Sequence, residues 1–318
     1  MNTSVANIPL DNCIMNASGC CCQTSLDLFL LQNSVSGAIV TKSCTLSERL
    51  GNEEPRYFQN DLLSINSMGL PNGGYDFYKN WIRQNNENKP VFFSICGQSP
   101  DEMQTLFQNI ESDFSDSKNI LCEVNISCPN VKGRPQLGYD FPMFEEILRK
   151  ISESRETKIP FGVKLPPYFD PIFFGTAADI LKKNSVSYIT TINSLGNGLV
   201  IDWNKEQPVI KPKDGLGGVG GKVCKPIGLS NVYQFYQELG NKIDIIGCGG
   251  IDVGTDVFEY ILAGANAVQI GSQLYRERPK SCLQRITDEF TQLLSTKKYD
   301  NVFQFRGRLY ERFPNHSL

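Results

Sequence analysis

Histidine is almost absent from this sequence. The only one, His316, lies two residues before the end of the 318-residue chain. This absence excludes a Ser-His or Cys-His catalytic pair, and a zinc site with histidine ligands, from the body of the fold. The sequence also has no run of about 20 apolar residues, so no segment is predicted to span a membrane. The first 30 residues lack the basic start and long apolar stretch of a secretory signal.

Net charge is also small. Lys and Arg together number 31 and Asp and Glu 34, which gives a net charge of −3 and argues against nucleic acid or an anionic membrane as the main partner. The chain has eleven cysteines, an odd number with no Cys-x-x-Cys pair. This pattern indicates buried free thiols in a reducing, cytoplasmic compartment. We interpret the consecutive cysteines Cys20, Cys21 and Cys22 as packing residues.

Eight short apolar runs, rich in Val, Ile and Phe, are spaced along the chain, and they predict buried strands. They are Cys13–Asn16, Ala38–Lys42, Val91–Cys96, Leu121–Ile126, Phe161–Leu165, Tyr188–Asn193, Ile243–Cys248 and Ala267–Gly271. Helical patterns separate most of them, at Asp101–Ile110 (after the start signal Ser99–Glu102), Phe144–Ser154, Gly175–Asn184, Leu229–Leu239, Val253–Ala263 and Lys280–Leu294. This alternation predicts a parallel sheet closed into a (β/α)8 TIM barrel, as one domain over residues 1–318.

Two long segments exceed the minimal barrel, and we expect them to form loops and small strands over its carboxyl-terminal mouth. They are Thr45–Gly74 and Asn197–Lys225. The second contains Gly215–Gly220, which matches Gly-x-Gly-x-x-Gly. Because no apolar strand precedes it, a dinucleotide fingerprint is not supported, and we expect a flexible, ligand-contacting loop.

The residues predicted to follow the strands are mainly amides, lysines and glycines, a set that suits a planar, carbonyl-rich anion and supplies no metal ligands. Lys42 and Lys164 end predicted strands, where they would be largely buried. Gly249-Gly250 and Gly271-Ser272 follow the seventh and eighth strands, the usual place of a phosphate site in such barrels.

Cys128 is the strongest candidate for a catalytic residue. It lies between a strand end and Pro129, at the start of a stretch, Val131–Gly138, that is typical of a lid over the barrel mouth. A free thiol has a pKa of about 8.5, so a small thiolate fraction is available near neutral pH as a general base.

Two motifs stand at and after the predicted catalytic cysteine: Asn125–Asn130 reads Asn-x-Ser-Cys-Pro-Asn and Gly133–Asp140 reads Gly-x-Pro-Gln-x-x-Tyr-Asp. They resemble the catalytic loop of the dihydroorotate dehydrogenase family. The resemblance runs from about Asn16 to Arg308 and includes Thr41–Thr45, Gly51–Phe58, Asn66–Asn72, Gly162–Asp170, Asn193–Gly198 and Phe305–Arg308.

The closest resemblance is to class 1A, the soluble homodimeric branch that uses FMN and fumarate. Class 2 enzymes carry serine at the position of Cys128 and have an N-terminal membrane-docking extension. Class 1B shares the cysteine but lacks the forms seen here at Gly51–Phe58 and Asn66–Asn72. The resemblance therefore implies a cytoplasmic homodimer that binds neither nucleic acid nor a membrane.

The resemblance also implies roles for individual residues in the oxidation of dihydroorotate to orotate, a step of pyrimidine biosynthesis. Cys128 would remove the C5 proton, hydride would pass to FMN, and fumarate would reoxidise the flavin. The pyrimidine and its carboxylate would be bound by Lys42, Asn66, Met68, Gly69, Leu70, Asn125, Asn130, Asn193 and Ser194. FMN would be bound by Ala17, Ser18, Gly19, Lys42, Ser43, Asn125, Lys164, Ile192, Gly221, Cys248, Gly249, Gly250, Gly271 and Ser272.

Three alternatives remain. One is a class 1B-like enzyme that reduces NAD through an iron–sulfur flavoprotein partner. A tRNA dihydrouridine synthase also pairs an FMN barrel with a cysteine, but the acidic balance and the lack of a basic RNA-binding domain argue against it. A non-catalytic flavin-binding protein would require a broken Cys128–Asn130 set, which is intact here. Ser18 and the cysteine triplet depart from the family pattern.

Overall fold

The computed structural model describes residues 1–85, 89–127 and 136–311. Eight parallel strands form one sheet in the order β3-β16-β15-β10-β9-β8-β7-β4. Their bounds are β3 (Ile14–Asn16), β4 (Ile39–Val40), β7 (Val91–Ile95), β8 (Ile120–Asn125), β9 (Phe161–Lys164), β10 (Tyr188–Thr191), β15 (Asp244–Cys248) and β16 (Ala267–Ile270). Each coincides with one predicted strand to within a few residues, so the predicted (β/α)8 barrel is confirmed.

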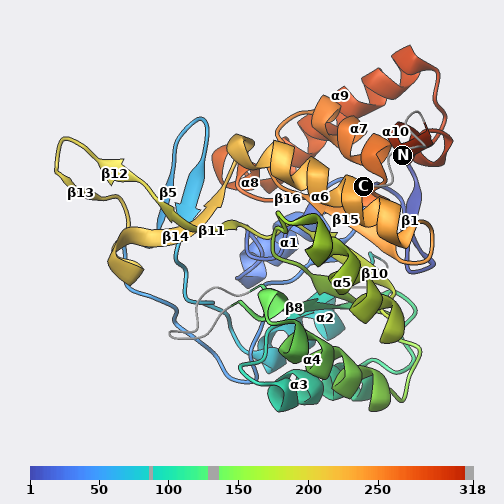
Figure 1. The fold of residues 1–318 in the computed structure, drawn as a ribbon, viewed down its shortest axis with the longest axis horizontal. Coiled ribbons are helices and arrows are strands. Elements are labelled where there is room, and N and C mark those ends of the chain that lie inside the picture. The colour runs from blue at the N-terminus through green and yellow to red at the C-terminus, as the bar shows by residue number, and fades with distance from the viewer. Residues whose placement is uncertain (86–88, 128–135, 312–318) are drawn as a thin grey trace.

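A helix follows each barrel strand, and the helices surround the sheet (Figure 1). They are α1 (Ser25–Gln32), α2 (Tyr75–Asn85), α3 (Pro100–Asp113), α4 (Phe141–Glu153), α5 (Pro171–Lys183), α6 (Lys225–Leu239), α7 (Gly254–Ala263) and α9 (Pro279–Lys297), with the shorter α8 (Gln273–Glu277) and α10 (Arg308–Glu311). The predicted start of α3 is confirmed, because the Ser99 side chain accepts a hydrogen bond of 3.1 Å from the backbone N–H of Glu102.

A side-chain amide closes the barrel between its first and second strands. Asn16 at the end of β3 donates to the carbonyl of Val40 at 2.7 Å and accepts from the N–H of Val40 at 2.9 Å. The N–H of Gly37 donates a hydrogen bond of 2.9 Å to the backbone carbonyl of Ile14. Asn16 thus substitutes for a strand residue in the ladder, and it is fully buried in this seam.

Side chains inside the barrel form layers, because alternate residues of a strand face the same side. Phe92 on β7 and Tyr188 on β10 pack edge to face, with ring centroids 5.3 Å apart. Two residues further along the same strands stand Ser94 and Thr190, both fully buried. A polar layer therefore lies above an aromatic one, toward the mouth.

A four-stranded antiparallel sheet, β11-β14-β6-β5, is built from the two long insertions. The remaining strands pair as hairpins at the N-terminus and at the tip of the second insertion. The bounds are β5 (Tyr57–Gln59), β6 (Ser64–Asn66), β11 (Leu195–Leu199), β14 (Leu216–Gly220), β1 (Thr3–Val5), β2 (Ile8–Leu10), β12 (Ile201–Asp202) and β13 (Gln207–Pro208). We call the β12–β13 hairpin, residues 201–208, the arm; it projects from the body of the molecule (Figure 1).

The expected loop at Gly215–Gly220 is largely strand β14, and that prediction was wrong. The glycines serve close packing across the small sheet. A Cβ atom on Gly217 would lie 2.5 Å from the carbonyl oxygen of Asn66, and one on Gly218 would lie 2.2 Å from the Ser194 hydroxyl. Gly217 and Gly218 lack side chains because Asn66 and Ser194 occupy that space.

Candidate active site

A pocket opens at the carboxyl ends of the barrel strands, and we call it the mouth pocket. Residues from seven barrel strands or the turns after them line it, together with the small sheet and α8. Of the predicted site residues, it contains Ala17, Ser18, Gly19, Lys42, Ser43, Asn66, Met68, Leu70, Asn125, Lys164, Ile192, Asn193, Ser194, Gly221, Cys248, Gly249, Gly250, Gly271 and Ser272. Segments far apart in the sequence thus meet around one space.

Three predicted residues are not placed there. Gly69 does not line the mouth pocket; it has a φ of 73°, and a Cβ atom on it would lie 2.4 Å from the Asn52 side-chain oxygen. Gly69 thus supports the turn that places Met68 and Leu70. Cys128 and Asn130 lie outside the described residues, as does most of the predicted lid.

Two buried ammonium groups give the mouth pocket a positive charge. Lys42 is 8% and Lys164 3% exposed, as expected for lysines at strand ends. Within the described part of the chain, neither has a carboxylate oxygen within 4.0 Å. The other lining charges pair with each other, Lys222 with Asp252 and Arg276 with Asp61. A cation buried without an adjacent anion is costly, so the pocket favours an anionic ligand.

The hydroxyl of Ser43 connects several predicted site residues. Ser18 Oγ lies 3.0 Å from Ser43 Oγ, and the Asn125 side chain donates to Ser43 Oγ at 3.0 Å. The N–H of Ser43 donates to Ser18 Oγ at 3.0 Å, so the Ser18 side chain is used structurally. These contacts fix the wall of the mouth pocket between β3, β4 and β8.

The turn after β15 is shaped to expose its backbone. Gly249 and Gly250 have φ values of 126° and 68°, in the region that glycine alone adopts readily. A Cβ atom on Gly250 would lie 2.7 Å from the backbone nitrogen of Lys225. Backbone N–H groups in such turns bind phosphate, and a larger side chain would not fit.

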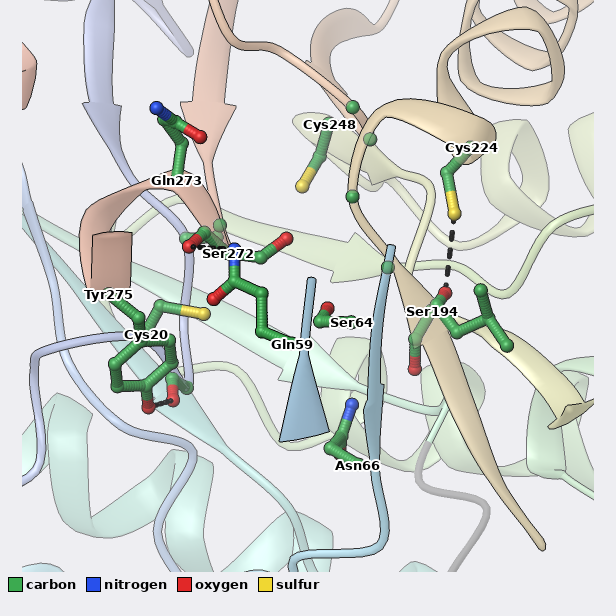
Figure 2. A pocket seen from close by; sticks show the side chains of 18 of the residues that line it. Cys20, Gln59, Ser64, Asn66, Ser194, Cys224, Cys248, Ser272, Gln273 and Tyr275 are labelled. Carbon is green, nitrogen blue, oxygen red and sulfur yellow. Dashed lines mark hydrogen bonds between the residues drawn. The ribbon is translucent and has the colours of Figure 1, made fainter. Parts of the chain in front are cut away.

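Residues of the first insertion and α8 cover one side of the mouth pocket, and sequence reasoning missed them. The side chain of Gln59 donates to the carbonyl of Ser272 at 3.2 Å, and the rings of Tyr57 and Tyr275 lie 5.0 Å apart. Figure 2 shows Gln59 meeting Ser272 beside Tyr275 and Cys20. Tyr57 and Phe58, the two aromatic residues in the sequence of the first insertion, were the available signal.

Burial keeps two thiols that line the mouth pocket, Cys20 and Cys224, in the neutral form. Burial raises the pKa of the Cys224 thiol to about 12, and raises the pKa of Cys20 further. Cys22 is buried, as its packing role predicts, and burial raises its pKa to about 11. Cys20 instead lines the mouth pocket, so the packing interpretation is incomplete for this residue.

The fold and pocket define a (β/α)8-barrel protein with a positively charged, polar site for an anionic ligand at its carboxyl mouth. Comparison with known proteins is more specific. The sequence profile described as "Dihydroorotate dehydrogenase" matches residues 1–294, and the chain belongs to this family. Members of the family are in general flavin-dependent oxidoreductases.

Among curated proteins, the chain is 46% identical over 314 residues to "Dihydroorotate dehydrogenase A (fumarate)" of Lactococcus lactis subsp. cremoris, covering 97% of this chain and 99% of the relative. It is 45% identical over 312 residues to the protein named "Putative dihydroorotate dehydrogenase A (fumarate)" of Streptococcus agalactiae serotype V, covering 97% and 98% of the two chains. The predicted family is therefore confirmed.

Among solved structures, the ligand-free dihydroorotate dehydrogenase of Eimeria tenella superposes with a TM-score of 0.78 at 19% identity, covering 96% of this chain and 91% of that one. The ferulenol complex of the same enzyme gives a TM-score of 0.77 at 18% identity, covering 96% and 87%. At this level of identity the likeness concerns the fold. No helix among the residues that the structure describes has the length and apolar character needed to cross a membrane.

Proposed function

We propose that this protein oxidises dihydroorotate to orotate in pyrimidine biosynthesis and passes the electrons to fumarate, which becomes succinate. The observation that carries the proposal is the 46% identity, over nearly the whole of both chains, with the relative whose name specifies fumarate. The positively charged mouth pocket supports it, because dihydroorotate and fumarate are both carboxylate anions.

FMN is the cofactor that we propose for the mouth pocket, and the residues present fit it. Lys42 and Lys164 supply buried positive charge, and the turns Gly249-Gly250 and Gly271-Ser272 offer backbone N–H groups for the phosphate. We propose that the full set is Ala17, Ser18, Gly19, Lys42, Ser43, Asn125, Lys164, Ile192, Gly221, Cys248, Gly249, Gly250, Gly271 and Ser272. When bound, FMN supplies the hydride acceptor.

Amide side chains suit the edge of a dihydropyrimidine, where donors and acceptors alternate. Asn66 uses its Nδ2 for the carbonyl of Gly218, at 3.2 Å, and so keeps its oxygen available as an acceptor. The N–H of Ser194 donates to Asn193 Oδ1 at 2.9 Å, which leaves the Asn193 Nδ2 as a donor. We propose that these residues, with Lys42, Met68, Gly69, Leu70, Asn125 and Asn130, orient the substrate.

We further propose that Cys128 takes the proton from C5 of the substrate. The raised pKa values of Cys20 and Cys224 support a division of labour. Burial keeps Cys20 and Cys224 protonated, so neither supplies a base at neutral pH.

The protein is proposed to act as a homodimer in the cytoplasm, within one domain over residues 1–318. Its arm carries exposed apolar side chains, since Ile201 is 58% and Trp203 80% exposed, and adjacent Leu199 is 50% exposed. Apolar groups gathered on a projecting hairpin support an interface with a second copy. All ten described cysteines are free thiols, which supports a reducing compartment.

One anaerobic experiment tests the proposed reaction. The purified protein, loaded with FMN, should lose its yellow absorbance on addition of dihydroorotate and regain it on addition of fumarate. Bleaching without recovery would favour the class 1B-like alternative, in which a partner flavoprotein carries electrons to NAD. A flavin that dihydroorotate does not bleach would overturn the substrate assignment.

A further inference from the structure

A carboxylate lies inside the barrel beneath the mouth pocket, in the polar layer described above. Glu123 on β8 is 0% exposed, although the strand around it is otherwise mostly apolar. Its Oε2 accepts hydrogen bonds of 2.9 Å from the Thr190 hydroxyl and 2.9 Å from the Gln269 side-chain nitrogen. Its Oε1 accepts a bond of 3.2 Å from Ser94. Three donors from three other strands thus converge on one acceptor group.

Gln269 connects this carboxylate to Lys164. The side-chain oxygen of Gln269 accepts a hydrogen bond of 2.8 Å from the Lys164 ammonium, while its nitrogen donates to Glu123. An ammonium only donates and a carboxylate only accepts, so these two partners permit one orientation of the amide. Gln269 is itself 0% exposed, so its side chain lies among these protein partners and not in bulk solvent.

The order of these groups places the positive charge outward. Lys164 lines the mouth pocket, whereas Gln269 and Glu123 do not. Glu123 is therefore a more distant counter-charge, separated from the ammonium by the length of an amide. Because Coulomb energies fall with distance, an anionic ligand beside Lys164 is attracted by the ammonium more strongly than it is repelled by the carboxylate of Glu123. A direct ion pair would have neutralised the lysine.

A second branch reaches the same carboxylate. Asn125 donates to Ser43, Ser43 Oγ lies 2.9 Å from Ser94 Oγ, and Ser94 donates to Glu123. Because Ser94 gives its proton to Glu123, Ser43 must give its own to Ser94. Glu123 thus fixes the direction of the hydrogen bonds on two walls of the mouth pocket.

We propose that Gln269 is a positioning residue, which holds the Lys164 ammonium against the mouth pocket so that it favours the negative charge a flavin gains on reduction. The proposal rests on the function proposed above, and it assigns a task to two residues, Gln269 and Glu123, that do not contact the ligand.

The test compares the bound flavin in Gln269→Met and Thr190→Val. Methionine keeps the volume of Gln269 but removes both contacts, whereas valine removes a different donor to Glu123 and leaves Lys164 its acceptor. We expect Gln269→Met to shift the two-electron equilibrium of the bound flavin about tenfold toward its oxidised form. This shift corresponds to a reduction potential that is about 30 mV more negative. FMN should also dissociate about tenfold more readily. Thr190→Val should lower the melting temperature and leave the reduction potential unchanged.

The reduction potential is measured against a reference dye with an enzymatic electron source, so dihydroorotate is not required. A wrong substrate assignment can therefore be distinguished from a wrong role for Gln269. In the first case dihydroorotate would not reduce the flavin of the wild type, while the reduction potentials of the variants would still decide the role of Gln269. Equal reduction potentials in wild type and Gln269→Met, or equal shifts in both variants, would overturn the proposal. If Gln269→Met does not fold, Gln269→Asn replaces it, because the amide shortened by one methylene cannot reach both partners. A wild-type chain that binds no FMN would overturn both proposals.

Discussion

The hydroxyl of Tyr260, on α7, donates a hydrogen bond of 2.7 Å to the carbonyl of Gly249, at the turn that follows β15. Burial raises the pKa of Tyr260 far above its usual value, so the hydroxyl keeps the proton it donates. The phenol fits against Gly228 of α6, where a Cβ atom would lie 2.0 Å from the hydroxyl oxygen. A helix behind the barrel thus supports the backbone that we propose for the phosphate.

Tyr260→Phe tests this support. The change leaves the carbonyl of Gly249 without its partner, and we expect it to lower the free energy of unfolding by about 1–2 kcal/mol. It should also raise the dissociation constant of FMN several-fold, because the turn is less firmly held. Urea unfolding and fluorescence titration with FMN measure the two effects.

Tyr188→Phe is the matched control. Its hydroxyl donates to the carbonyl of Cys122 at 2.8 Å, within the barrel and away from the mouth pocket. We expect a similar loss of stability and an unchanged affinity for FMN. If Tyr260→Phe and Tyr188→Phe bind FMN with equal affinity, Tyr260 has a structural role only.

Lys164→Met tests the charge of the mouth pocket. Removing a charged hydrogen-bond donor from a buried site costs about 1.5–3 kcal/mol, so the dissociation constant of FMN should rise by about 10- to 100-fold. Lys182→Met, on the exposed side of α5, is the control that preserves the pocket. An unchanged affinity for FMN in Lys164→Met would contradict the proposed binding set.

The barrel was predictable because its signals are local and repeated. Each barrel strand is a short apolar run, and the order of runs and helical patterns fixes the parallel topology. Helix α1 was not predicted, although Thr24 and Asp27 form the capping box that marks its start.

Small strands in the two insertions were expected, but their pairing into one sheet could not be predicted, since the insertions lie more than 100 residues apart in the sequence. Gly217 and Gly218 resemble a loop in the sequence, and only the neighbouring Asn66 and Ser194 explain why side chains are absent there. The role of Glu123 could not be predicted from the sequence either. An acid within an apolar run is a signal of a buried network, but its partners come from three other strands.

Cys128→Ser tests the proposed base. A hydroxyl gives up its proton far less readily than a thiol, and general-base catalysis contributes roughly 10²–10⁴-fold. We therefore expect flavin reduction by dihydroorotate at neutral pH to slow by at least about 100-fold, while FMN stays bound. Stopped-flow absorbance under anaerobic conditions gives the rate. Cys282→Ser, in the buried face of α9, should keep the wild-type rate, and equal rates in both variants would remove Cys128 from its role.

Ile201→Asp tests the arm as a dimer interface. The side chain is 58% exposed in the single chain, so a charge there costs little in the isolated subunit. In a dimer that buries the arm, the aspartate would be desolvated, and we expect dissociation to monomers at micromolar concentration. Sedimentation velocity measures the state. Ile172→Asp, an exposed apolar residue in the first turn of α5, is the control. A wild-type protein that sediments as a monomer would refute the proposed assembly.

The pH dependence of stability tests an ion pair that joins the end of α8 to α9. Arg285 donates to Glu277 at 2.8 Å and 2.6 Å, and these bonds hold the pKa of the Glu277 carboxyl below its usual value of 4.5. Because the pKa is lower in the folded state, the pair stabilises the protein above the unfolded-state pKa, and this contribution is lost as the pH falls through the folded-state pKa. Arg285→Met should therefore have a lower melting temperature than the wild type at pH 7, and the difference between the two melting temperatures should narrow as the pH falls below about 4.5.

Arg149→Met, which breaks the exposed pair with Glu153, is the control and should change the melting temperature little at any pH. A gap between Arg285→Met and wild type that is the same at pH 3 and pH 7 would mean that Arg285 stabilises the fold through packing rather than through the charge of Glu277.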